Sequence, residues 1–218
     1  MKLVDNLLLG AKQKVSATNK NDIDPTELGL FIKELYAEVD WLAKPSPSNG
    51  VLHYPDPIHL SLIERRLLVR TVFAFIEAVM FNLKITAVGS KRADSFSAGE
   101  MALAKEEDYE LDDSGAVKIR SARIRFLSNF RFAFTVAAKA SGSDYKIDVG
   151  GTGWQSLRDT VPVRDRLMHP KRVADLAVTD EEIRSLMRAF EWVEKELIIV
   201  SLKGLKDART TRTKLPDK

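Results

Sequence analysis

Apolar residues recur at intervals of three and four along most of the chain, which is the pattern of amphipathic helices packed around a core. The first such helix is predicted to begin at Asp24, because Pro25 and Glu27 follow it as a first-turn proline and an N3 glutamate. It is predicted to end before Pro45. Its predicted inward stripe consists of Leu28, Phe31, Leu35, Val39 and Leu42.

A second helix is predicted to begin at Asp56 and Pro57 and to run for about 29 residues, or about 43 Å. It would be the longest element of the fold. Its most apolar stretch, VFAFIEAVMF, contains Glu77 and falls short of the roughly 18 apolar residues that span a bilayer. The N-terminal residues are interrupted by Asp5 and do not resemble a secretory signal. We therefore expect a soluble, cytoplasmic protein with no membrane partner.

The middle of the chain is predicted to contain a short helix followed by a turn. Ser97 and Glu100 have the spacing of a capping box, and this helix is expected to end near Asp108. The stretch YELDDSGAVKI that follows has a strand–turn–strand pattern with its bend at Asp113 to Gly115. A two-stranded hairpin and a plain loop both fit this pattern.

Three more helices are predicted in the C-terminal half. Residues 119–140 form one, with a stripe of Phe126, Phe130, Phe134 and Ala137. Residues 154–168 form another, which Pro162 should kink or divide. Thr179 and Glu182 provide a capping box for the last helix. The inward positions of this last helix are Ile183, Leu186, Phe190, Val193 and Leu197.

These elements predict an all-α fold, a helical bundle with one small β-hairpin. One domain is predicted for residues 1–200, with an insertion at about 95–118. Residues 201–218 have too little apolar content to pack and are predicted to be a disordered basic tail.

Composition excludes some chemistry and shows that charge is segregated. The 218 residues include no cysteine, which excludes disulfides, thiolate metal sites and a cysteine nucleophile. The net charge of +3 comes from the tail, which contains six basic and two acidic residues. Residues 100–113 carry seven carboxylates and one lysine, whereas residues 114–143 carry six basic residues and no carboxylate. The basic run is either a solvated helix face or a surface for nucleic acid.

Neither a phosphate-binding loop nor a metal site is indicated. The stretch VGGTGW lacks the lysine and hydroxyl spacing of a P-loop, and its glycines fit a turn before the next helix. The three histidines, His53, His59 and His169, are scattered and join no carboxylate pattern typical of a metal site. No metal and no cofactor is therefore predicted.

The strongest chemical pattern is Arg164-Asp165-Arg166-Leu167-Met168-His169-Pro170, in which an arginine and an acid precede a histidine. Residues four apart share a helix face, so Asp165 could orient the His169 ring through a hydrogen bond. Arg164 and His169 diverge on an ideal helix. Because Pro170 disfavours the α conformation at His169, the helix is expected to end there. Arginine and histidine would then converge through that helix end or across a two-fold dimer axis.

This R-D-x-x-x-H pattern resembles the motif of the HEPN superfamily (higher eukaryotes and prokaryotes nucleotide-binding domain). The resemblance implies a metal-independent endoribonuclease with a composite pocket between two protomers, so RNA and a second copy of the chain are expected partners. It also implies toxin–antitoxin, abortive-infection or other defence systems, with an antitoxin or regulatory protein as a further partner. In this interpretation His169 is the acid/base, Arg164 binds the scissile phosphate and Asp165 orients.

Further residues are assigned supporting roles around this motif. Glu77 could face the same pocket, although a structural carboxylate also explains it. Predicted RNA-binding residues are Arg158, Arg166, Lys171 and Arg172. Two alternatives remain open: a noncatalytic module that binds RNA, a nucleotide or a protein, and a structural network in which Arg164 pairs with Asp165 or Asp159.

Overall fold

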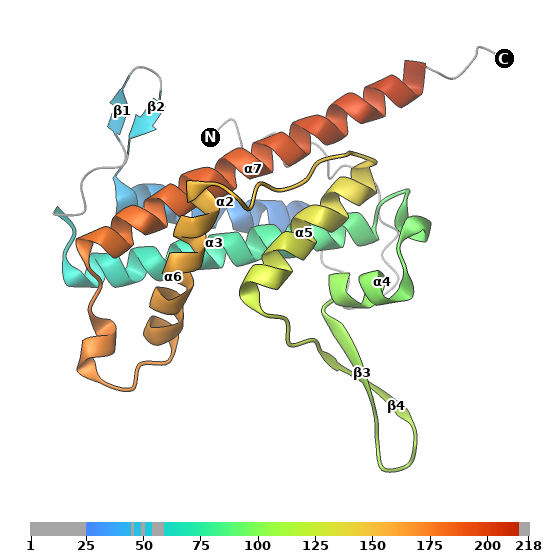
Figure 1. Cartoon of the computed structure of the whole chain (residues 1–218), viewed down its shortest axis with the longest axis horizontal. Helices are drawn as coiled ribbons and strands as arrows, with labels where there is room; N and C mark the ends of the chain where they lie inside the picture. Colours follow the sequence, from blue (N-terminus) through green and yellow to red (C-terminus); the bar gives the residue numbers. More distant parts are fainter. Residues whose placement is uncertain (1–24, 45, 49–50, 54–58, 214–218) are drawn as a thin grey trace. The chain divides into compact units, whose positions relative to one another are not determined.

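The computed structural model describes residues 25–44, 46–48, 51–53 and 59–213, coloured along the sequence in Figure 1. The expected mostly helical fold with a small antiparallel hairpin is confirmed. In the described part of the chain, the helices are α2 (Pro25–Ala43), α3 (Leu62–Val88), α4 (Ala98–Ala104), α5 (Phe126–Ser141), α6 (Thr152–Met168) and α7 (Asp180–Thr213). The strands are β1 (Ser46–Ser48), β2 (Val51–His53), β3 (Glu107–Leu111) and β4 (Val117–Ser121), and short 3₁₀ turns occur at η2 (Ala93–Ser95) and η3 (Val173–Leu176).

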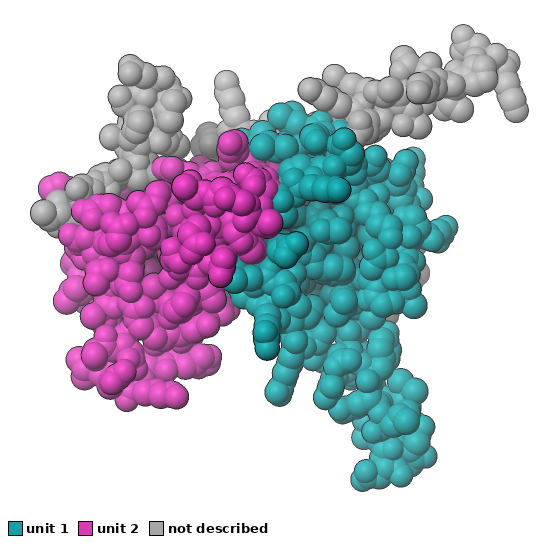
Figure 2. Space-filling view, in the orientation of Figure 1, with its two compact units in different colours: residues 1–26, 79–147, 198–218 teal, residues 27–78, 148–197 magenta. Residues whose placement is uncertain are grey.

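The chain divides into two compact units, which Figure 2 shows in different colours. Unit 1 comprises residues 1–26, 79–147 and 198–218, and unit 2 comprises residues 27–78 and 148–197. The helices α3 and α7 each contribute residues to both units. The hairpin β3–β4 lies in unit 1, and the motif around His169 lies in unit 2.

The core of unit 2 contains buried side chains from α2, α3, α6 and α7. Tyr36, Phe75 and Phe190 form an aromatic cluster with ring centroids 5.4–6.0 Å apart. The predicted stripe of α7 is confirmed, since Ile183, Leu186, Phe190, Val193 and Leu197 are all at most 1% exposed. In α2 the stripe was wrong at Phe31, which is 53% exposed, whereas Ile32 is buried. Ile32 is four residues after Leu28, so it continues the buried face and Phe31 turns outward.

The core of unit 1 centres on α5. Phe130 and Phe134 are fully buried, with their rings 4.9 Å apart, and Phe134 also contacts Tyr145 at 6.3 Å. The predicted start of this helix at residue 119 was wrong, because residues 117–121 pair with β3 and the helix begins at Phe126. At its other end, Gly142 adopts a left-handed conformation (φ 73°), which glycine provides at no steric cost.

Three of the described helices begin with a capping box, and one of these boxes was not predicted from the sequence. The predicted boxes Ser97–Glu100 and Thr179–Glu182 both form their reciprocal hydrogen bonds. A third box begins α3, where the Ser61 amide donates to Glu64 at 2.8 Å and the Glu64 amide donates to the Ser61 hydroxyl at 3.3 Å. That helix therefore begins at Leu62. The predicted start at Asp56 and Pro57 lies outside the described residues.

The lengths of α6, α7 and α3 bear on three of the predictions. Pro162 lies inside α6 without dividing it. The longest described helix is α7, with 34 residues, rather than α3, with 27. Because α7 continues to Thr213, residues 201–213 of the predicted disordered tail are helical, and residues 214–218 lie outside the described part.

The helix α3 has the length and apolar composition of a membrane span, which corrects the expectation that no segment comes close to one. Of its most apolar 18-residue window, 56% is buried inside the protein. Its polar side chains have partners in the protein, as Glu77 pairs with Arg164 and Lys84 pairs with Glu106. The core helix of a globular protein has the same properties.

Candidate functional site

The motif lies at the C-terminal end of α6. The helix ends at Met168, and His169 is its C-cap with φ −131° and ψ 58°. The His169 amide still donates to the Asp165 carbonyl at 3.1 Å, so the last turn is closed before the chain leaves the helix. The expected helix end before Pro170 is confirmed, and the His169 residue is exposed.

Arg164 is held by three groups within unit 2. One guanidinium nitrogen, Nη2, donates a very short hydrogen bond to Glu77 of α3, and Nη1 donates to Asp165 Oδ1 at 3.0 Å. The guanidinium also lies over the Phe73 ring, 5.7 Å from its centroid. Phe73 and Glu77 are four residues apart and present one face of α3 to α6. The Arg164 side chain is only 25% exposed, and these three contacts hold its guanidinium.

Asp165 pairs with its neighbour in sequence rather than with His169. The predicted hydrogen bond from the His169 ring to Asp165 does not form, and among the described residues the His169 side chain has no hydrogen-bond partner. A charged guanidinium is a stronger donor to a carboxylate than a neutral imidazole, which explains the choice. The pairing of Arg164 with Asp165 is the one that the structural alternative predicted. His169 is left with a ring that no described residue orients.

Arg70 is a neighbour of the motif that the sequence interpretation missed. Its Nη2 donates to the Leu167 carbonyl at 3.1 Å. That carbonyl belongs to the last turn of α6, where backbone acceptors lack partners within the helix and a cation is favourable. Arg70, Phe73 and Glu77 have the spacing i, i+3, i+7 and therefore share one face of α3.

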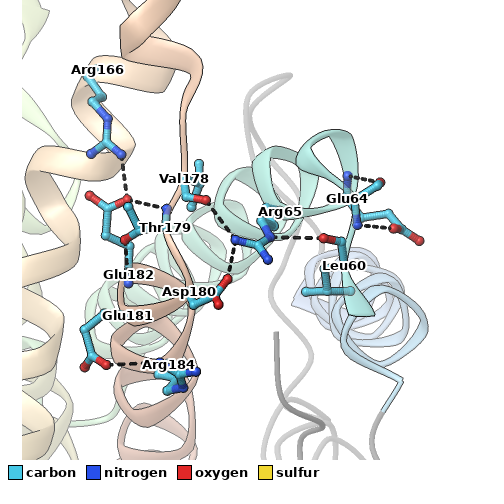
Figure 3. A network of polar contacts seen from close by, with 11 residues as sticks. Leu60, Glu64, Arg65, Arg166, Val178, Thr179, Asp180, Glu181, Glu182 and Arg184 are labelled. Atoms are coloured by element: carbon cyan, nitrogen blue, oxygen red, sulfur yellow. Dashed lines mark hydrogen bonds and ion pairs between the residues drawn. The ribbon is translucent and has the colours of Figure 1, made fainter. Parts of the chain in front are cut away.

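The four predicted RNA-binding residues have different environments. Arg166 is engaged within unit 2, because its Nη2 donates to Glu182 at 2.8 Å (Figure 3) and also to the Ala177 carbonyl at 2.7 Å. Arg158 and Lys171 are exposed. The Arg172 side chain is 80% exposed and pairs with Asp175. Arg166 therefore links α6 to the start of α7, whereas Arg158, Lys171 and Arg172 remain exposed to solvent.

The loop after His169 is fixed by the Asp175 carboxylate. It accepts hydrogen bonds from the Lys171 amide at 2.8 Å and the Arg172 amide at 3.2 Å. These contacts, the Lys171 amide first among them, lower the pKa of Asp175. Farther along, Arg65 joins the start of α3 to the start of α7 through the Val178 carbonyl at 3.1 Å and Asp180 at 2.5 Å (Figure 3). The chain that follows His169 is thus anchored at two points.

The site combines a fixed guanidinium with an exposed imidazole on one helix. A guanidinium can bind a phosphate, and an imidazole can accept or donate a proton. In the described ranges, no three histidine or carboxylate side chains converge as metal ligands. No protein-family model, no curated protein and no solved structure matches the chain.

Proposed function

We propose that this protein is a metal-independent endoribonuclease of the HEPN type that acts in the cytoplasm as a homodimer. The proposal rests on one observation, the different environments of Arg164 and His169 at the C-terminal end of α6. Arg164 is fixed by Glu77 and Asp165, while His169 lies exposed at the end of the same helix. The motif resemblance supplies the substrate class, RNA.

In the proposed reaction the substrate supplies its own nucleophile. His169 accepts the proton of a ribose 2′-hydroxyl, and the 2′ oxygen attacks the adjacent phosphorus. The bond from phosphorus to the 5′ oxygen breaks, and that oxygen takes a proton from a protonated His169. The products are a 2′,3′-cyclic phosphate and a 5′-hydroxyl. Arg164 stabilises the charge that develops on the phosphoryl oxygens.

The ion pairs of Arg164 suggest how a phosphate would enter. The Asp165 side chain is 58% exposed and the Glu77 side chain is 44% exposed, so Asp165 is the more exposed of the two carboxylates that pair with Arg164. We expect a phosphate to replace Asp165 at Nη1 while Glu77 keeps Nη2 in place. Glu77 is then a positioning residue. Asp165, which we had expected to orient His169, instead occupies the anion position until substrate arrives.

A role in toxin–antitoxin or phage defence extends the proposal. Expression of such a nuclease without a neutralising partner would cut cellular RNA. We therefore expect the wild-type chain to slow growth on expression and His169→Ala to relieve the effect.

The test is RNA cleavage in the presence of EDTA, comparing the wild type with His169→Ala. His59→Ala is the matched control, because it removes another exposed histidine of unit 2 outside the motif. The proposal expects cleavage by the wild type and by His59→Ala, and a loss of at least 100-fold in His169→Ala. Equal cleavage by all three proteins would assign the activity to another site or a contaminant and refute the role of His169.

A noncatalytic module is the second candidate, and one observation favours it. Two carboxylates already neutralise Arg164, as expected of a structural network at a helix end. In that case the protein would bind RNA or a protein partner without turnover. RNA binding that weakens with salt, together with no cleavage by the wild type, would select this candidate.

A further inference from the structure

The hairpin β3–β4 is a two-stranded ribbon that projects from the rest of unit 1 (Figure 2). Its register pairs Tyr109 with Ile119 and Leu111 with Val117. Side chains alternate between the two faces of a strand, so these four residues lie on one face. All four are more than half exposed, from 51% at Tyr109 to 72% at Leu111. We call these four residues the apolar face of the hairpin.

The opposite face is charged, and both of its basic side chains pair with carboxylates of the same hairpin. Arg120 pairs with Asp108 at 2.8 Å and with Glu110 at 2.9 Å, and Lys118 lies 3.5 Å from Asp112. On the apolar face the one charged neighbour is Glu107, at the base of the ribbon, where it accepts a hydrogen bond from the Tyr109 hydroxyl at 2.8 Å. A partner for the apolar face therefore needs no compensating charge.

The base of the ribbon is firmly attached to the helices of unit 1. Glu106, which adopts an unusual positive φ of 59°, pairs with the fully buried Lys84 of α3 at 2.5 Å. Lys84 also donates to Asn129 of α5 at 3.0 Å. The Ala122 amide donates to the Glu106 carbonyl at 2.7 Å and closes the ribbon. The apolar face is thus presented by an anchored arm, which reduces the entropy lost on docking.

Charge excludes three modes of covering this face. The tip carries Asp112 and Asp113, which oppose insertion into a lipid bilayer. Residues 107–121 carry five carboxylates and two basic side chains, and this net negative charge repels the phosphates of RNA. Two-fold symmetric edge-to-edge pairing would bring β3 beside β3 or β4 beside β4, and either arrangement places like charges next to each other. Stacking of apolar faces avoids all of these conflicts, because both charged faces then point to solvent.

We propose that the apolar face of the hairpin docks on the same face of a second copy of this chain, around a two-fold axis. The inference goes beyond the proposed nuclease function and does not depend on cleavage. Taking roughly 100 Å² for each side chain, two stacked faces bury about 800 Å², less than the roughly 1,200–2,000 Å² of stable complexes. We therefore expect a dimer that dissociates in the micromolar range.

The first test changes the apolar face without touching the core. The double variant Leu111→Lys with Ile119→Lys places four like charges in the dimer, and both sites are more than 60% exposed, so folding should be unaffected. Lys118→Gln on the opposite face is the matched control. Sedimentation velocity over about 1–500 µM should show a dissociation constant at least tenfold higher for the double variant and near the wild-type value for the control. A wild type that stays monomeric, or a double variant that dimerises as the wild type does, would overturn the proposal.

A second test uses the absence of cysteine from the chain. Tyr109, Leu111, Val117 and Ile119 are each replaced by cysteine, with Lys118→Cys as the control. Oxidation should cross-link at least one variant of the apolar face into a dimer, and the control should remain monomeric on a non-reducing gel. Cross-linking of the control alone, or of none, refutes face-to-face docking. A wild type that dimerises through this face but does not cut RNA would refute the proposed function and leave the interface standing.

Discussion

Replacing Glu194 by glutamine should stabilise the protein at alkaline pH. Glu194 lies in α7 and accepts a hydrogen bond from the Tyr36 hydroxyl of α2. Burial, together with the charges of Asp40 and Glu191, raises the pKa of Glu194 from 4.5 to about 7. The folded state therefore holds a proton on Glu194 at pH values where the unfolded chain has released it.

The size and sign of the effect follow from this pKa. A rise from 4.5 to about 7 corresponds to about 3 kcal/mol, since one pKa unit is worth about 1.4 kcal/mol. Because the pKa is raised in the folded state, the wild type loses this stability as pH rises from about 4.5 to above 7. Glutamine cannot ionise, yet it still accepts the Tyr36 hydrogen bond. Glu194→Gln should thus match the wild type near pH 4.5 and exceed its free energy of unfolding by up to about 3 kcal/mol at pH 8.

Urea unfolding of both proteins at pH 4.5, 6, 7 and 8 measures this difference. Glu34→Gln removes an exposed carboxylate of α2 and serves as the control, for which we expect a pH-independent change within about 0.5 kcal/mol. A difference between Glu194→Gln and the wild type that does not grow with pH would refute the reasoning. So would a loss of stability at pH 8.

Two further predictions concern unit 1. Glu106→Gln leaves the fully buried Lys84 ammonium without its counter-charge and should cost about 2–3 kcal/mol in urea unfolding, whereas Lys84→Met removes the charge and should cost less. The reverse order would show that the ion pair itself stabilises the fold. Phe134→Ala deletes a fully buried ring that contacts Phe130 and Tyr145, and it should lower the free energy of unfolding by about 3–5 kcal/mol. A loss below about 1 kcal/mol in the same assay would contradict the packing of this core.

Local rules predicted the elements well because their signals lie within one turn of helix. The capping boxes at Ser97 and Thr179 and the inward stripe of α7 were all visible in the sequence and are confirmed. The helix that contains Phe31 was correctly predicted, but its inward-facing position was assigned to Phe31 instead of Ile32. The continuation of α7 over residues 201–213 was missed because the sequence there lacks the apolar content that normally marks a packed helix.

The contacts of the site were less predictable because they join residues far apart in sequence. Glu77 and Arg164 are separated by 87 positions, and Arg70 and Leu167 by 97. The sequence identified Glu77 as an acid in an apolar helix but could not choose its partner. Arg70 gave no such signal, since a single arginine on a long helix is ordinary.

The failed prediction at Asp165 bears directly on the proposed function. Helical spacing alone would have paired Asp165 with His169, but the neighbouring guanidinium takes that carboxylate instead. Each chain then offers an arginine that is already fixed and a histidine that no described residue orients. An imidazole in that state needs a further group to orient it, and a second copy of the chain supplies one if the pocket is composite. Cleavage in EDTA tests this chemistry, whereas cross-linking through the hairpin tests a separate proposal about assembly, and neither result depends on the other.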